Sequence, residues 1–114
     1  MKIIYDKRPW GEEEILNTNQ ICTVKILTVN PRQRFSLQYH NHRKEFWKVI
    51  EGEAVVEIDG KKFDAETGDE YEIENKIIHR LQGKNVATKV LEISYGEFDE
   101  NDIVRLEDDY GRIK

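Results

Sequence analysis

Cysteine, proline and long apolar runs are all scarce in this chain of 114 residues. Its single cysteine, Cys22, excludes an intrachain disulfide and a CxxC metal site, and it fits a reducing compartment. No stretch approaches the ~20 apolar residues of a membrane span, and the N-terminus lacks the apolar run of a signal peptide. We therefore expect a cytoplasmic protein without a membrane-spanning segment.

Basic charge is also in short supply, because 18 Lys and Arg stand against 23 Asp and Glu, for a net charge of -5. Proteins that bind nucleic acids hold the phosphate backbone with clustered basic side chains, so we expect no nucleic-acid partner. Apolar residues make up 38% of the chain and gather in β-branched and aromatic runs, which excludes a disordered chain. The length predicts one domain that spans residues 1–114.

Short β-branched and aromatic runs alternate with turn residues, such as Asn30-Pro31 and Asp59-Gly60. These runs predict about eight strands, over residues 21–29, 34–40, 46–50, 54–58, 61–65, 70–74, 77–82 and 87–95. Strands this short and this evenly spaced are typical of an all-β sandwich or barrel. We expect an N-terminal arm over about residues 1–20, a barrel over about 21–98 and a tail over about 99–114, and only the tail could form a helical turn.

Alternation along the predicted strands assigns side chains to faces. Ala54, Val56 and Ile58 share one face and are expected to point into the barrel. In the stretch SLQYHNHRKEFW, one face carries only polar groups, namely Ser36, Gln38, His40 and His42. If that face lines the interior, its groups need partners, because unpaired buried polar groups are costly.

His40 and His42 lie at positions i and i+2 of a predicted strand, so both imidazoles point the same way and can converge on one ion. Glu45 would face the other side under strict alternation, so a bend or bulge near Arg43-Lys44 must bring it round. His79, on a later strand, can join them when the barrel closes. Three imidazoles and a carboxylate suit Zn, Mn, Co, Fe or Ni. Spacing alone leaves a second interpretation open, a histidine pair that binds no metal.

These stretches resemble the cupin superfamily. Its first motif is a histidine pair, then a glutamate, six residues and a glycine, and it is matched by His40, His42, Glu45 and Gly52, while His79 takes the place of the second motif's histidine. The proline and glycine of the second motif are replaced here by Glu74 and Lys76.

Within the cupins, the chain is similar to the C-terminal domain of type II mannose-6-phosphate isomerases. The similarity lies in RPWG, SLQYHNHRKEFW, HRL and DIVRLEDDYGR, which occur in the family's order over nearly the whole chain. In that family the domain often follows a nucleotidyltransferase. The resemblance therefore implies the isomerase half alone.

The resemblance implies a single-domain cupin, a double-stranded β-helix or jelly-roll barrel, that binds one divalent metal ion, with Zn as the first expectation. The implied metal ligands are His40, His42, Glu45 and His79. The implied reaction interconverts mannose 6-phosphate and fructose 6-phosphate, in which a metal polarises the sugar carbonyl. Glu92, where the family also has Glu, is the expected acid and base; a metal-bound hydroxide is the alternative for that role, and Glu92 would then be an exposed strand carboxylate. Gln38 is expected to contact the substrate or orient a ligand.

A sugar phosphate as the small-molecule partner needs cations, and arginine suits phosphate well. Arg43, which lies between the proposed ligands, is the first expectation for the phosphate site, and further candidates are Lys48, Arg80, Arg112 and Arg8. For Arg105, a salt bridge to the acidic residues of the tail is favoured instead.

Two other functions stay open on the sequence. One is a non-catalytic cupin that binds a sugar or a sugar nucleotide as a regulatory module, and the other is a different carbohydrate isomerase or epimerase on the same barrel. The resemblance also implies a homodimer. Ile3, Ile4 and Tyr5 suit a strand exchanged between two copies, and they could equally pack on their own barrel.

Overall fold

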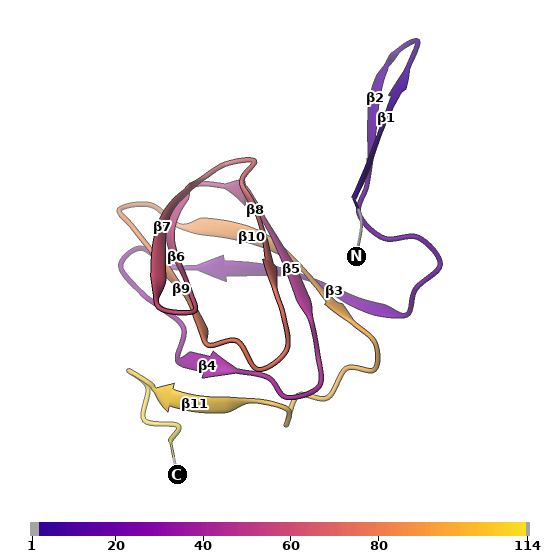
Figure 1. Cartoon of the computed structure of the whole chain (residues 1–114). Coiled ribbons are helices and arrows are strands. Elements are labelled where there is room, and N and C mark those ends of the chain that lie inside the picture. Colours follow the sequence, from indigo (N-terminus) through magenta and orange to yellow (C-terminus); the bar gives the residue numbers. More distant parts are fainter. Residues whose placement is uncertain (1–2, 114) are drawn as a thin grey trace.

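The computed structural model describes residues 3–113, and every regular element in that range is a β-strand (Figure 1). The strands are β1 (Ile4–Arg8), β2 (Gly11–Ile15), β3 (Cys22–Val29), β4 (Leu37–Tyr39), β5 (Glu45–Glu51), β6 (Glu53–Ile58), β7 (Lys61–Glu66), β8 (Glu70–Ile73), β9 (His79–Gly83), β10 (Thr88–Tyr95) and β11 (Val104–Glu107). Across the described range, no helix is long and apolar enough to cross a membrane.

The barrel consists of two antiparallel sheets that curve around a common interior (Figure 1). One sheet has the strand order β3-β10-β5-β8, and the other has the order β11-β4-β9-β6-β7. Both sheets contribute to one apolar core, made of Val29, Trp47, Val49, Ala54, Val56, Ala65, Ile73, Leu81 and Val90. The predicted all-β jelly-roll is confirmed, and the full burial of Ala54 and Val56 confirms the predicted inward face of β6.

The tail differs from its prediction. Within the described residues it forms no helix: a turn at residues 100–101, with Asp99 accepting from the backbone N–H of Asn101, is followed by Val104–Glu107 as β11, which pairs antiparallel with β4. A sheet edge offers unpaired backbone N–H and C=O groups, and the tail satisfies those of β4. The strand predicted over residues 34–40 is also shorter than expected, since β4 ends at Tyr39.

The N-terminal arm also contains two strands that the sequence pattern does not predict. β1 and β2 pair only with each other and project from the barrel as a hairpin (Figure 1). Polar contacts tie the hairpin to the barrel: Tyr5 Oη donates to Glu70 at 2.6 Å, and Lys48 Nζ donates to Glu14 at 2.6 and 2.7 Å. A two-stranded hairpin is marginally stable alone in water, so it depends on contacts outside itself.

Candidate metal centre

The second sheet contributes a row of three side chains to the candidate centre. Gln38 of β4 lies opposite Arg105 of β11 on one side and opposite His79 of β9 on the other. Directly opposed residues of antiparallel strands point to the same face of the sheet. Arg105, Gln38 and His79 therefore share one face, and His40 follows immediately after the end of β4.

The first sheet contributes a facing group. Ser94 of β10 lies opposite Glu45 of β5, and Glu92 lies opposite Trp47 of β5 and Lys25 of β3. By the same rule of opposed residues, a Lys25–Glu92–Trp47 row runs across three strands with Ser94 and Glu45 beside it. The pairing of distant strands thus gathers two carboxylates and a lysine on one interior face.

Three buried side chains converge between these groups. The ligand atoms of His40, Glu45 and His79 lie within 4.8 Å of one another. Glu45 Oε1 is 3.3 Å from His40 Nε2 and 3.4 Å from His79 Nε2. No member of this trio is more than 2% exposed. A bend does precede Glu45, but it lies at residues 41–42 and not near Arg43-Lys44, where the sequence predicted it.

Backbone carbonyls fix the orientation of both imidazoles in the trio. His40 Nδ1 lies 2.7 Å from the carbonyl oxygen of Asp102, and His79 Nδ1 lies 2.8 Å from that of Ile77. A carbonyl can only accept a hydrogen bond, so each Nδ1 carries the proton and donates it. Each Nε2 therefore points toward Glu45. Backbone partners of this kind are typical of histidines that bind metals.

The trio fits a divalent metal ion on two observations. First, Glu45 Oε1 and His79 Nε2 are buried and have no hydrogen-bond partner among the described residues. An unsatisfied buried polar group costs about 1–3 kcal/mol, so two such atoms side by side call for a shared partner. Second, two imidazole nitrogens and one carboxylate are a donor set that Zn and other first-row divalent ions accept, with positions left open for a substrate.

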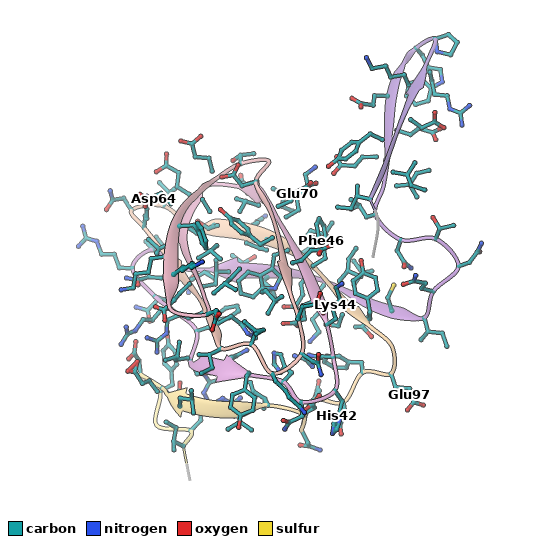
Figure 2. The ribbon with its side chains drawn as sticks, in the orientation of Figure 1. His42, Lys44, Phe46, Asp64, Glu70 and Glu97 are labelled. Atoms are coloured by element: carbon teal, nitrogen blue, oxygen red, sulfur yellow. The ribbon has the colours of Figure 1, made fainter. Side chains whose placement is uncertain are left out.

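His42 does not join the trio, which corrects the prediction of a fourth protein ligand. Its side chain is exposed, and it lies outside the cluster of atoms that could hold an ion. In Figure 2 it is labelled at the bend between β4 and β5. The prediction assumed that a strand continues through His40 and His42, whereas β4 ends at Tyr39 and alternation ends with it.

Glu92 lies beside Glu45 in a network with two donors. Trp47 Nε1 donates to Glu92 Oε2 at 3.1 Å, while Ser94 Oγ lies 3.2 Å from Glu92 Oε1 and 3.2 Å from Glu45 Oε2. A serine hydroxyl has a single proton, so it can donate to only one carboxylate at a time. Ser94 therefore links the two glutamates but can satisfy only one of them at a time.

The two glutamates differ in acidity. The pKa of Glu92 is raised to about 7, first by burial and second by the negative charge of Glu45. Burial also opposes the ionisation of Glu45, but the close approach of His40 and His79 outweighs it and holds the pKa of Glu45 well below its usual range. Glu92 is therefore the carboxyl that can exchange a proton near neutral pH.

A cavity of about 640 Å³ opens beside the trio, and Gln38, Arg43 and Glu92 line it. Gln38 Nε2 is 3.5 Å from His40 Nε2. Arg43 reaches the trio more closely, with Nη2 at 3.2 Å from His40 Nε2 and Nε at 3.4 Å from Glu45 Oε2. A molecule in the cavity would thus meet the trio through these three side chains.

The same cavity is lined by five basic side chains, Lys25, Arg34, Arg43, Arg105 and Arg112. Arg34 and Arg112 are already bound to carboxylates of the tail, Asp109 and Asp108. Within residues 3–113, neither Lys25 nor Arg105 forms an ion pair, and the buried Nε of Arg105 has no hydrogen-bond partner. The salt bridge expected for Arg105 is therefore wrong, because its pairing opposite Gln38 directs it to the cavity.

Three predicted phosphate ligands lie away from this cavity, which corrects their assignment. Lys48 follows Trp47 in β5 and points to the opposite face, where it binds Glu14 and Glu70. Arg80 follows His79 in β9, and its guanidinium binds the Phe35 carbonyl and Glu107. Arg8 lies in the projecting hairpin, paired with Asp6.

The fold and the site together define a class, a cupin-type barrel with a candidate metal centre of two histidines and one glutamate. Residues 3–108 match the family model described as mannose-6-phosphate isomerase C-terminal. The chain therefore belongs to that family.

Its relatives are longer enzymes and biosynthetic proteins. The chain is 38% identical over 107 residues to the alginate biosynthesis protein AlgA of Pseudomonas aeruginosa, and the match covers 92% of this chain and 22% of AlgA. It is 36% identical over 109 residues to a mannose-1-phosphate guanylyltransferase of Escherichia coli strain K12, with 93% of this chain and 23% of that enzyme covered. The chain thus spans less than a quarter of the length of these relatives.

A solved structure supports the fold over nearly the whole chain. The capsular polysaccharide assembling protein CapF from Staphylococcus aureus aligns with a TM-score of 0.70 at 14% identity, covering 93% of this chain and 34% of CapF. At this identity the likeness shows the fold alone.

Proposed function

We propose that this domain is a metal-dependent aldose–ketose isomerase that interconverts mannose 6-phosphate and fructose 6-phosphate. The observation that carries the proposal is the buried trio of His40, Glu45 and His79, which has two unsatisfied ligand atoms and lies beside a cavity lined by Glu92 and basic side chains. Membership of the isomerase C-terminal family supports the same reaction.

His40, Glu45 and His79 would hold the ion, with Zn first and Mn, Co, Fe or Ni as alternatives. When bound, a divalent ion supplies a Lewis acid that polarises the sugar carbonyl. The protein's part is to fix the ligands, and the carbonyls of Asp102 and Ile77 do so by holding both imidazoles with Nε2 inward.

Glu92 is proposed as the group that moves the proton. Its carboxylate takes the proton from C2 of the aldose and returns it to C1, while the hydroxyl proton on O2 passes to O1. These two transfers give the ketose with no net gain or loss of protons. A pKa of about 7, set first by burial, matches a group that must both accept and donate near neutral pH. The Trp47 indole N–H holds this carboxylate in place, and Gln38, on the opposite wall, is proposed to bind a sugar hydroxyl.

The phosphate is proposed to bind the basic side chains of the cavity, namely Arg43, Lys25 and Arg105, with Arg112 at the margin. Lys25 and Arg105 have no ion pair within the described residues, so their charges are available to an anion. Arg105 and Lys25 lie on the two different sheets. Arg105 is paired opposite Gln38, and Lys25 is paired opposite Glu92. A phosphate between them would orient the sugar toward Glu92 and the trio.

The test is an isomerase assay with and without added Zn²⁺, Mn²⁺ or Co²⁺, using mannose 6-phosphate, free mannose and GDP-mannose. Of the three sugars, we expect only mannose 6-phosphate to be isomerised, and only when metal is present. We expect His40→Ala to abolish this activity. His42→Ala is the matched control, because it removes a neighbouring exposed imidazole that is outside the trio. Binding without turnover, or turnover without metal, would contradict the proposal, and the first result would favour a non-catalytic sugar-binding module.

We further propose that the protein is a homodimer. The hairpin projects from the barrel (Figure 1), and its Ile4, Tyr5 and Trp10 are 45%, 55% and 72% exposed. Val24 and Ile26 on the outer face of β3 are 58% and 53% exposed, so two apolar surfaces are available for pairing. Light scattering should give a dimer mass that Ile26→Lys lowers to that of a monomer, and Phe63→Lys, on the other sheet, is the control. A monomeric wild type would refute this part.

A cytoplasmic location completes the proposal. The one cysteine, Cys22, is a free thiol, which fits a reducing compartment. Fractionation of cells that express the tagged protein tests the location.

A further inference from the structure

Arg43 places a positive charge on the same side chains that the proposed ion would use. Its Nη2 is 3.2 Å from His40 Nε2, and its Nε is 3.4 Å from Glu45 Oε2. The side chain is only 9% exposed. A guanidinium keeps its charge at every pH at which proteins fold, so Arg43 is a permanent cation at the candidate metal centre.

This contact and a metal ion exclude each other at His40. Nδ1 of His40 donates to the Asp102 carbonyl, which leaves one lone pair, on Nε2, for every other partner. An N–H of Arg43 that donates to this lone pair leaves none for a metal. Two cations at contact distance also repel each other. Because the guanidinium cannot lose its proton, it must move before an ion can bind.

The surroundings of Arg43 provide room for that movement. Arg43 lines both the cavity of about 640 Å³ and a second one of about 550 Å³, in which Phe98 is another lining residue. Its Cζ lies 4.8 Å from the centroid of the Phe98 ring, which is within the range of a cation–π contact. The guanidinium can therefore leave His40 while it stays against Phe98 and within the cavity.

We propose that Arg43 is a built-in competitor of the metal ion. In the metal-free protein it neutralises Glu45 and occupies the lone pair of His40, and a divalent ion that takes these ligands releases it into the cavity. The released N–H groups are then free to bind an anion, so the metal and the anion each strengthen the binding of the other. The inference rests on the proposed metal-dependent function and adds the order of events, metal before sugar phosphate.

The first experiment measures the affinity for Zn²⁺ and Co²⁺ by competition with a chromophoric chelator, in wild type, Arg43→Met and Lys25→Met. Loss of a competing charge-assisted hydrogen bond should tighten metal binding by about tenfold or more in Arg43→Met. Lys25→Met removes a cation that lines the same cavity without contacting the trio, and it should change the affinity by less than about threefold. Arg43→Gln replaces Arg43→Met if the latter does not fold.

The second experiment needs no enzymatic activity and uses inorganic phosphate as the probe. Calorimetric titration of wild type should show tighter phosphate binding in the presence of Zn²⁺ than in its absence. In Arg43→Met this difference should vanish. The wild-type Arg Nε–Hε NMR resonance assigned to Arg43 should also shift when the metal is added, which reports its movement directly.

The outcomes separate the two proposals. If wild type binds metal but folded Arg43→Met or Arg43→Gln binds it equally or more weakly, the competition is refuted and the metal centre stands. If neither wild type nor variant binds a divalent ion, the metal-dependent function fails and the competition fails with it. Equal tightening by Lys25→Met would assign the effect to general charge and would also refute the competition.

Discussion

Replacement of Asp102 by alanine should weaken both the fold and the metal centre, because this tail residue holds the bend that carries His40. Its carboxylate accepts hydrogen bonds from the backbone N–H of Asn41 at 2.8 Å and of His42 at 2.9 Å, while its carbonyl accepts from His40 Nδ1 at 2.7 Å. Burial would raise the pKa of Asp102, but these two N–H donors hold it below its usual range. The residue is therefore ionised and bound at neutral pH.

The magnitude follows from the two bonds that Asp102→Ala removes. Hydrogen bonds to a charged group contribute about 1.5–3 kcal/mol each. Asp102 is only partly buried, so water can replace part of that contribution. We expect a loss of about 1–2 kcal/mol in the free energy of unfolding. Displacement of a group that orients a metal-binding histidine typically lowers metal affinity by about 10–100-fold.

The assay pairs urea denaturation with a chelator-competition measurement of Zn²⁺ affinity. Asp99→Ala is the matched control, since Asp99 lies in the same loop and only caps Asn101 locally. Asp99→Ala should change the free energy of unfolding by less than about 1 kcal/mol and leave the affinity for Zn²⁺ unchanged. If Asp102→Ala lowers stability but retains full metal affinity, the tail does not position His40 and the reasoning is refuted.

Three further predictions concern the buried network and one turn. In chelator-treated protein, a folded pKa of about 7 for Glu92 against 4.5 means that the folded state holds a proton that the unfolded chain gives up. The free energy of unfolding of wild type should thus fall by about 2.5 kcal/mol as pH rises from 5 to 8, and urea midpoints of Glu92→Gln should lack this fall. Trp47→Phe removes the indole donor to the buried Glu92 carboxyl and should lower the free energy of unfolding by about 1–3 kcal/mol, measured by thermal or urea unfolding. An unchanged free energy would contradict this prediction and would mean that water replaces the donor. Gly52 has φ of 85°, and a Cβ there would lie 2.6 Å from the Ala87 carbonyl oxygen, whereas at Gly60, with φ of 78°, a Cβ would meet open space. Gly60→Ala should lower the free energy of unfolding by about 1–2 kcal/mol because of the left-handed backbone, and Gly52→Ala should lower it clearly more. Equal losses in the two variants would contradict the clash at Gly52.

The strands of the barrel could be predicted because their signals are local. Alternating or continuous apolar runs end at turn dipeptides such as Asp59-Gly60, and the pattern needs no knowledge of the partner strand. The hairpin gives no such signal: its strands read IYDKR and GEEEI, polar on both faces. β11, four residues long, forms because β4 offers an edge, which is a tertiary cause that the tail's own sequence does not contain.

The candidate metal centre could be predicted only in part from the sequence, for the same reason. His40, Glu45 and His79 follow from motif spacing, and the structure brings all three together. The place of His42 depended on where β4 ends, and strand ends are set by pairing. β4 has a single residue paired with β9, Gln38 with His79, so the strand and its alternation end one residue later, at Tyr39.

The basic residues of the cavity divide into those that alternation could have sorted and those that it could not. Once Trp47 and His79 are taken as inward, the next residue in each strand must point outward, which excludes Lys48 and Arg80 from sequence alone. Lys25 is harder, because β3 has apolar residues on both of its faces and its pattern does not say which is inside. Arg105 requires the register of β11 on β4, since only its position opposite Gln38 directs it into the cavity. Lys25 and Arg105 are therefore placed at the cavity by strand pairing, and their lack of an ion pair within residues 3–113 is a property of the folded barrel.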